Sequence, residues 1–294
     1  MPKILVIGET GQLAQSLGNL RWPGGLALEF AGRRHISGAF PDAATRLIEE
    51  RKPDLVMNAA AYTAVDRAES EPHAAHVANA DLPLALAIVC GDLDIPLVHV
   101  STDYVFDGEK RSPYLETDTP NPLGVYGAAK LAGDRAVERA GLARWAILRT
   151  SWVVSEISET FPVKLLRRAR TGEALRVVDD QWGCPTAASD LARAMLGVGL
   201  RLLDGDRDAS GLFNFCGASE MSWHGFAEKL LAAAEPLGLT RPPLQAISSA
   251  ELQAPARRPA YSVLSCARIQ QALGISGMPI EDEIKRIARV VLAV

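Results

Sequence analysis

Two short stretches of the 294-residue chain gather side chains that could act on a small molecule. Residues 126–130 read YGAAK, and a spacing of four places Tyr126 and Lys130 on one face of a helix, within reach of a shared ligand. A Tyr-x-x-x-Lys pair arises by chance in many helices, so its meaning depends on its surroundings. Residues 101–108 read STDYVFDG, and four polar side chains directly follow an apolar run: Ser101, Thr102, Asp103 and Tyr104.

A glycine-containing turn near the start of the chain, GETGQLA at residues 8–14, could bind phosphates. Gly8 permits a tight turn, Gly11 lets the backbone approach a pyrophosphate, and Ala14 takes a close-packing position. Such a pattern is weak by itself, but here it follows an apolar run and opens a helical pattern, whose free N–H groups would hold the phosphates. The residues of this predicted dinucleotide site are Gly8, Gly11, Gln12 and Leu13.

The second predicted strand ends without the carboxylate that would bind a ribose 2′-hydroxyl. Glu29 lies too early, inside the strand, and Arg33 and Arg34 follow it instead. Arginines at this place can pair with a 2′-phosphate, although two surface arginines in a loop would look the same. We therefore expect NADPH as cofactor, with Arg33 in contact with it and NADH as an alternative.

The elements that must position these residues alternate regularly. Strands are expected at 3–7, 26–30, 54–58, 96–100 and 145–149, and helices at 12–20, 43–51, 71–91 and 125–140. This alternation is typical of a right-handed, doubly wound parallel sheet. We predict an α/β fold with a dinucleotide-binding Rossmann domain over residues 1–150. The smaller region 151–294 is expected to be mainly for substrate, with some segments returning to the first domain.

The motifs in order resemble those of a known family. After the glycine turn come NAAAYTAVDRAE, STDYVF, NPLGVYGAAKLAGDRAV, RTSWVV, DDQWGCPT and RRPAYSVL, spanning about residues 3 to 290. The chain thus resembles the extended short-chain dehydrogenases/reductases, and within them the reductases of 4-keto sugar nucleotides. The resemblance implies a dTDP-sugar substrate, with the C4 ketone of dTDP-4-dehydro-6-deoxy-L-mannose reduced to give dTDP-L-rhamnose.

The resemblance also implies a catalytic set of Thr102, Tyr126 and Lys130. Tyr126 would protonate the ketone oxygen as hydride arrives, and Thr102 would bond the same oxygen. The ordinary pKa of tyrosine is near 10, and the Lys130 ammonium should lower it toward neutrality. Lys130 would also hold the nicotinamide ribose.

Further contacts are carried over from the family in the same way. Those expected to line the cofactor are Ala60, Ala61, Tyr62 and Asn79. Those expected to contact the substrate are Asp103, Tyr104, Trp152, Gln181 and Arg258, although a buried tryptophan at a strand end is as often core. The residues after Arg258 (PAYS) are bulkier than usual in the family, which leaves the sugar or nucleotide choice open.

Three other functions share this fold. The first is a catalytically silent, dinucleotide-binding regulatory subunit, against which the intact Thr102, Tyr126 and Lys130 argue. The second is a reductase of another 4-keto sugar nucleotide. The third is a dehydratase or epimerase; dehydrating relatives read Thr-Asp-Glu where this chain has Tyr104 in place of the glutamate, and a phenol is a poor base at neutral pH.

Net charge and the distribution of apolar residues limit the classes of partner that we expect. A net charge of −4 and a pI near 5.8 favour no nucleic-acid surface. The N-terminal apolar stretch breaks at Glu9, too early for a signal peptide, and we expect no apolar run to reach the ~20 residues of a membrane span. We therefore expect a cytoplasmic protein whose four dispersed cysteines are reduced.

We expect no metal site. His73 and His76 lack a third ligand. Some relatives dimerise around magnesium held by acidic side chains, but the matching positions here are Gln15-Ser16 and Ser189, which carry no charged oxygen. The neighbouring Asp190 could supply the missing acidic ligand. A homodimer remains possible.

Overall fold

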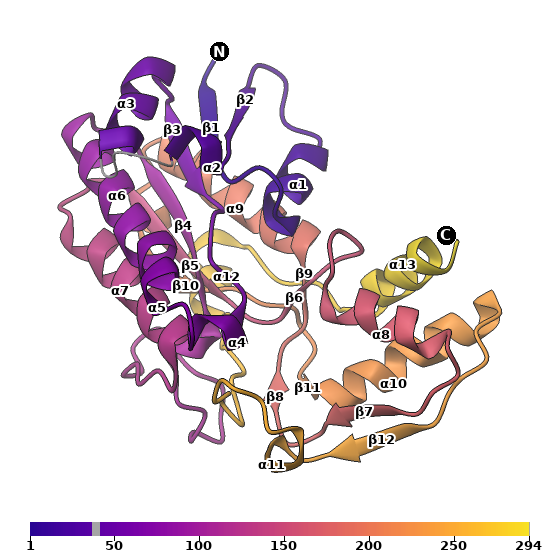
Figure 1. The fold of residues 1–294 in the computed structure, drawn as a ribbon. Coiled ribbons are helices and arrows are strands. Elements are labelled where there is room, and N and C mark those ends of the chain that lie inside the picture. Colours follow the sequence, from indigo (N-terminus) through magenta and orange to yellow (C-terminus); the bar gives the residue numbers. More distant parts are fainter. Residues whose placement is uncertain (37–41, 294) are drawn as a thin grey trace.

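The computed structural model describes residues 1–36 and 42–293. Its centre is a six-stranded parallel sheet in the order β10-β5-β4-β3-β1-β2 (Figure 1). The strands are β1 (Lys3–Ile7), β2 (Ala27–Ala31), β3 (Leu55–Asn58), β4 (Leu97–Thr102), β5 (Trp145–Thr150) and β10 (Gly211–Asn214).

Long helices cover both faces of the sheet (Figure 1). They are, on one face, α1 (Gln12–Asn19) and α9 (Ala188–Leu203), and, on the other, α3 (Asp42–Arg51), α6 (Leu82–Asp92) and α7 (Val125–Arg139). Because successive side chains of a strand point to opposite faces, Ile4 and Val6 enter one apolar core while Leu5 and Ile7 enter the other. The continuous apolar run of β1 is therefore the pattern of a strand buried on both sides.

Short helical segments connect these elements. They are α2 (Arg33–Ile36), α4 (Val65–Ala68), α5 (Pro72–His76), the π-helix η1 (Val77–Asp81), η2 (Asp103–Val105), η3 (Arg207–Ala209), η4 (Glu235–Leu237), α11 (Ser249–Leu252) and α12 (Ala267–Leu273).

The segments α5, η1 and α6 form one continuous helical stretch, Pro72–Asp92. It is long and apolar enough to cross a membrane, with a mean hydropathy of 1.4, so the expectation that no run reached this length was wrong. However, 56% of its most apolar window is buried inside the protein, where it packs against α3 and α7. The stretch is a core helix of the α/β fold.

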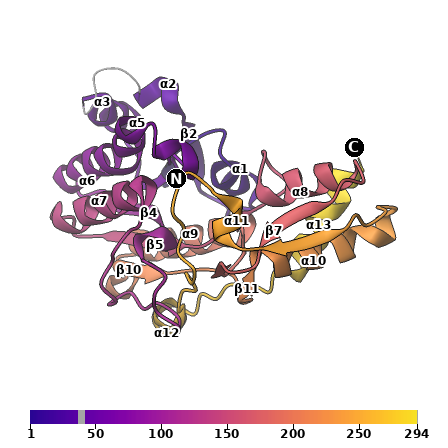
Figure 2. The ribbon, with the colours of Figure 1, turned by 60° about the horizontal axis from the view of Figure 1, so that its bottom comes forward.

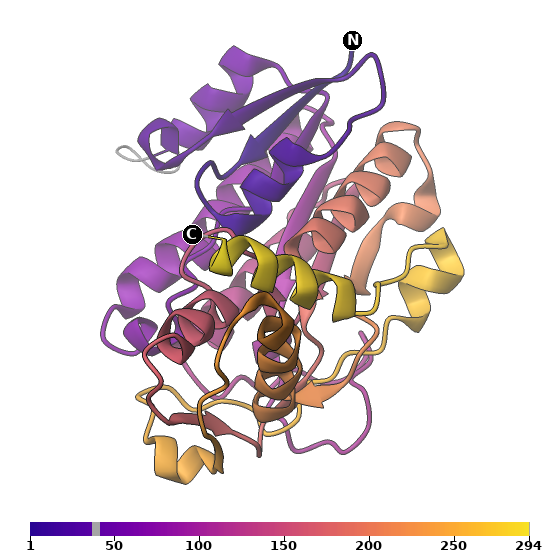
Figure 3. The same cartoon turned by 90° about the vertical axis from the view of Figure 1, so that its right-hand side faces the viewer.

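A second lobe lies beside the sheet (Figure 2). Its elements are β7 (Leu175–Val178) paired with β12 (Leu244–Ile247), and the helices α8 (Phe161–Ala169), α10 (Trp223–Ala234) and α13 (Glu281–Leu292). The last two helices lie side by side over a separate apolar core (Figure 3). Two short ladders are separate from the six-stranded sheet: β6 (Val153–Val154) with β9 (Thr186–Ala187), and β8 (Trp182–Gly183) with β11 (Met221–Ser222).

The predicted α/β fold is confirmed, and the predicted strands and helices begin and end within two residues of the observed ones. The chain runs from β1 outward to β2 and then returns to the other side of β1 as β3. Such a reversal opens a crevice at the carboxyl ends of the strands, where ligands of these folds bind.

Candidate active site

The glycine turn between β1 and α1 sits tightly against the end of β3. Gly8 has φ +122°, and a Cβ there would lie 3.3 Å from the carbonyl carbon of Ala59 and the amide nitrogen of Ala60. Gly11 is the N-cap of α1, and a Cβ there would meet nothing within 4 Å. This open space leaves room for a phosphate at the first N–H groups of α1. The conformation of this turn is therefore compatible with the dinucleotide that the glycine spacing predicts.

The two residues after Gly11 point their side chains into the protein. The Gln12 amide donates to the Val153 carbonyl (3.0 Å) and accepts from the Ser155 hydroxyl (2.9 Å). Leu13 is buried in the core between α1 and α9. Any cofactor contact by Gln12 or Leu13 would thus come from their backbone, while Gln12 ties the turn to β6.

A carboxylate that the sequence did not predict lies at the end of β2. Glu9 packs against Gly32, where a Cβ would come within 3.0 Å of the Glu9 Cβ, and its Oε1 lies 2.9 Å from Nη2 of Arg34. Arg33 is exposed beside it, and Glu29 lies inside β2, as expected. The region where a ribose 2′-substituent would bind therefore holds both charges.

The loop after β3 is held by buried amides. The Asn79 side chain accepts from the Tyr62 N–H (2.9 Å) and donates to the Tyr62 carbonyl (3.0 Å). The Tyr62 hydroxyl donates to Glu71 (2.6 Å), while Ala60 is half-buried and Ala61 exposed. Asn79 thus fixes the backbone of Tyr62, one of the residues predicted to line the cofactor.

The polar residues 101–104 form a hydrogen-bonded turn at the end of β4. Thr102 caps η2 by accepting from the Tyr104 N–H (3.2 Å), and its hydroxyl donates to Asp103 (3.0 Å). The other Asp103 oxygen accepts from the Ser151 hydroxyl (3.0 Å). Burial raises the pKa of Asp103 to about 6, although its hydrogen bonds oppose this rise.

Three contacts fix the position of α7, and the first of them is with this turn. A Cβ at Gly127 would lie 2.2 Å from the Tyr104 carbonyl oxygen, and one at Gly133 would lie 2.1 Å from the Asn79 carbonyl oxygen, so both positions require glycine. The Glu69 carboxylate accepts from the Val125 N–H (2.9 Å) and so satisfies the first turn of the helix. The helix therefore places Tyr126 and Lys130 beside the end of β4.

Tyr126 and Lys130 have unusual environments. The Tyr126 ring is half-buried and packs edge-on against Tyr104 at 5.8 Å between centroids. Lys130 is buried, and its Nζ donates to the Val100 carbonyl (2.5 Å). Burial raises the pKa of Tyr126 to about 12 and lowers that of Lys130 to about 8. The expected lowering of the Tyr126 pKa by Lys130 is thus not seen, because desolvation dominates and the ammonium is turned to a backbone carbonyl.

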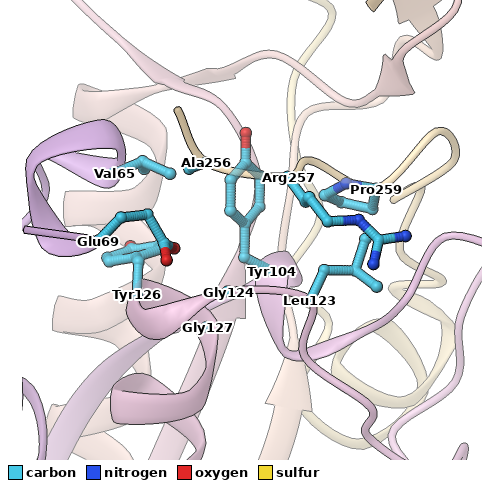
Figure 4. Close-up of a pocket in the computed structure, with 10 residues that line it drawn as sticks. All are labelled: Val65, Glu69, Tyr104, Leu123, Gly124, Tyr126, Gly127, Ala256, Arg257 and Pro259. Atoms are coloured by element: carbon cyan, nitrogen blue, oxygen red, sulfur yellow. The ribbon is translucent and has the colours of Figure 1, made fainter. Parts of the chain in front are cut away.

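A pocket opens beside the two tyrosines (Figure 4). Tyr104 stands in its centre, and Tyr126 and Glu69 lie to one side of it (Figure 4). Arg258, expected to contact substrate, lies near this pocket and pairs with Asp66 at 2.9 Å. Burial raises the pKa of Tyr104 above its ordinary value, so this phenol stays neutral.

Two predicted substrate residues lie in packed surroundings. Trp152 is nearly buried with φ +46°, and its ring stacks on Trp223 at 3.7 Å between centroids. Gln181 is buried and donates to the Ser249 hydroxyl (2.8 Å). Substrate contact by either residue remains a prediction.

Within residues 1–36 and 42–293, no cluster of three or more His, Cys, Asp or Glu side chains could hold a metal ion. The Asp190 carboxylate pairs with Arg193 and accepts from the Met278 N–H (3.2 Å). Independence from magnesium remains our prediction.

Sequence reasoning missed several residues of this site. They are Glu9, Asn58, Asp66, Glu69, His99 and Ser151. Of these, His99 had a signal in the sequence, because it is a polar residue inside the apolar run PLVHV.

Comparison with known proteins identifies close relatives. The family profile described as RmlD substrate binding domain matches residues 2–292. A dTDP-4-dehydrorhamnose reductase from Sinorhizobium fredii is 39% identical over 286 residues, covering 97% of this chain and 96% of the relative. Another, from Burkholderia thailandensis, is 40% identical over 282 residues, covering 93% of each chain.

Solved structures agree with these relatives. A crystal structure of a dTDP-4-dehydrorhamnose reductase from Clostridium acetobutylicum superposes with a TM-score of 0.89 at 30% identity, covering 98% of this chain and 99% of that one. The enzyme from Bacillus anthracis, in complex with NADP, gives a TM-score of 0.87 at 27% identity, covering 100% and 99%.

Proposed function

Because the chain belongs to the RmlD family of dTDP-4-dehydrorhamnose reductases, which are NAD(P)H-dependent oxidoreductases, we propose that it uses NADPH and that Thr102, Tyr126 and Lys130 carry the reduction. Its activity is the reduction of the C4 ketone of dTDP-4-dehydro-6-deoxy-L-mannose to dTDP-L-rhamnose. The observation that supports the catalytic set is the packing of α7 against the end of β4. Gly127 abuts the Tyr104 carbonyl, the Tyr126 ring packs on Tyr104 two residues after Thr102, and Lys130 bonds the Val100 carbonyl of the same strand.

The residues present fit a dinucleotide. The open space at Gly11 and the N-terminus of α1 suit a pyrophosphate, Ala60, Ala61 and Tyr62 would line the cofactor, and NADPH, when bound, would supply the hydride. Arg33 and Arg34 would face the 2′-phosphate, which favours NADPH over NADH by charge. The relative from Bacillus anthracis was crystallised with NADP, which agrees with this assignment.

Tyr126 would donate the proton that the C4 oxygen needs. Its raised pKa, to about 12, keeps the phenol protonated at neutral pH, and an alkoxide is still a stronger base than the phenolate that results. The Thr102 hydroxyl would bond the same oxygen, and Asp103 would hold that hydroxyl through the bond already present. Lys130 would leave the Val100 carbonyl to support the phenolate and the ribose hydroxyls.

The substrate would lie over Tyr104, with Arg258 near its diphosphate. Tyr104 takes the place of the glutamate used by dehydrating relatives, and its raised pKa makes it a poor base. Elimination of water should therefore be absent, which distinguishes the reductase from a dehydratase on the same scaffold.

The test is turnover by the purified chain. We expect NADPH oxidation with dTDP-4-dehydro-6-deoxy-L-mannose and formation of dTDP-L-rhamnose, followed by nicotinamide absorbance and product chromatography. Tyr126→Phe should lose roughly 100-fold or more in kcat while still binding NADPH, as for removal of a general acid. Near-normal turnover by Tyr126→Phe would contradict the mechanism, and conversion of dTDP-glucose to a 4-keto-6-deoxy sugar without NADPH consumption would contradict the reaction.

A further inference from the structure

Lys130 rests in the core beside a histidine that the mechanism above does not use. The Lys130 Nζ lies 3.4 Å from Nε2 of His99, in addition to its bond with the Val100 carbonyl. His99 is fully buried in β4, and its other ring nitrogen, Nδ1, lies 3.1 Å from the Asn58 amide nitrogen. Three side chains from β3, β4 and α7 thus form one buried row.

A backbone N–H group determines the direction of the hydrogen bonds in this row. The Ala60 N–H donates to the Asn58 Oδ1 (3.1 Å), so the NH₂ group of Asn58 must face His99. An amide NH₂ can only donate, and therefore it requires a lone pair on Nδ1 of the ring. Burial, reinforced by the charge of Lys130, lowers the pKa of His99 well below its ordinary value, so the ring is neutral. A neutral ring with a lone pair on Nδ1 carries its proton on Nε2, toward Lys130.

An N–H group is a poor neighbour for an ammonium. The ammonium has three donors and no acceptor, so it cannot bond the Nε2–H, whereas a neutral amine can accept from it. The opposing group is Asp134 on the same helix, whose charge favours the ammonium but is shared with Arg149 at 3.0 Å. Tyr126, the other titratable group of this face, is a neutral phenol.

We propose that His99, held as the Nε2–H tautomer by Asn58, is a positioning residue that destabilises the ammonium of Lys130 in its resting place and so releases it toward the cofactor ribose and Tyr126. This inference rests on the proposed catalytic role of Lys130. Burial alone lowers the pKa of Lys130 to about 8, and the contact with His99 would act in the same direction.

The sharpest test is Asn58→Asp, which replaces one NH₂ group by oxygen. A carboxylate still accepts from the Ala60 N–H but can only accept from the ring, so the proton moves to Nδ1 and Nε2 becomes an acceptor for the ammonium. Free-enzyme groups govern the pH profile of kcat/KM for NADPH. We expect its alkaline limb, near pH 8 in the parent, to rise by roughly one pH unit or more, and the plateau below it to fall because Lys130 is held back.

A readout independent of activity is the ring itself. Nitrogen-15 NMR of histidine-labelled protein, which has five histidines, should show the Nε2–H tautomer for His99 in the parent and Nδ1–H in Asn58→Asp. If Asn58→Asp does not fold, His99→Gln serves instead, since its carbonyl can face the ammonium and should also raise the alkaline limb.

The outcomes separate the two claims. An Nδ1–H tautomer in the parent protein, or an unmoved alkaline limb in a folded variant, would overturn the inference and leave the proposed function intact. Full activity of Lys130→Met would overturn the role of Lys130 and this inference with it.

Discussion

Glu9 and Arg34 form an ion pair between the glycine turn and the end of β2. The pair is exposed, so it contributes little to stability, but a 2′-phosphate would have to compete with Glu9 for the arginine. We expect Glu9→Ala to raise the ratio of kcat/KM for NADPH to that for NADH by about threefold to tenfold. Steady-state rates with both cofactors measure this ratio.

Arg34→Ala is the matched control and should lower the same ratio. A ratio that stays constant in both variants would show that this pair does not touch the cofactor.

Asp103 should give the protein a recognisable pH dependence of stability. Its pKa is about 6 in the folded state against an ordinary value of 3.8, so between these values the folded state keeps a proton that the unfolded state has lost. Stability from this group is therefore greatest below about pH 4 and falls as pH rises toward 6. The loss amounts to roughly 3 kcal/mol.

The measurement is the free energy of unfolding in urea between pH 4 and 7. The difference between Asp103→Asn and the parent should grow in favour of the variant as pH rises through this window. Parallel profiles would mean that Asp103 is not desolvated as described.

Single residues differ in how far the sequence predicts them. The roles of Gly8 and Gly11 follow from spacing along one turn, so they could be predicted. The contact of Asn58 with His99 depends on the register of β3 against β4, in which these two residues are direct partners. No local pattern encodes that register, and this is why the buried row beside Lys130 was missed.

At the scale of elements, the position of α7 depends on Gly127. A Cβ there would lie 2.2 Å from the Tyr104 carbonyl oxygen, so Gly127→Ala must push the helix and the end of β4 apart. A displacement of about 1 Å can cost up to 100-fold in rate, and we expect kcat to fall at least tenfold. The melting temperature should fall as well.

Gly24→Ala is the control, because a Cβ at Gly24 meets nothing within 4 Å and its φ is not positive. It should leave both kcat and the melting temperature near those of the parent. Unchanged kcat in Gly127→Ala would show that α7 tolerates the shift.

The elements themselves were the most predictable level. Apolar runs of four to six residues between glycine, proline and polar turns matched β1, β3, β4 and β5, because strands buried on both faces need such runs. The second lobe was less predictable. Its two-residue strands, such as β6 and β8, carry too little pattern to be found.

At the scale of the whole molecule, the sheet depends on segments from both halves of the chain. β10 pairs with β5 along one edge, and α9 covers the face that includes Val6 and Leu148. We expect a fragment of residues 1–150 to aggregate, since it would expose both an apolar face and an unpaired edge strand. Size-exclusion chromatography and circular dichroism of the fragment beside the full chain measure this. A monomeric, cooperatively melting fragment would contradict it.

The pairing of β10 with β5 also has a consequence for how the protein is made. A ribosome releases β5 well before β10, because residues 151–210 lie between them. At about 5–20 residues per second, the nascent chain would spend several seconds or more with an open apolar edge. β10 is the last strand to join the sheet. Until it is synthesised, the newly made chain needs protection, for example by a chaperone, against aggregation through the exposed edge of β5.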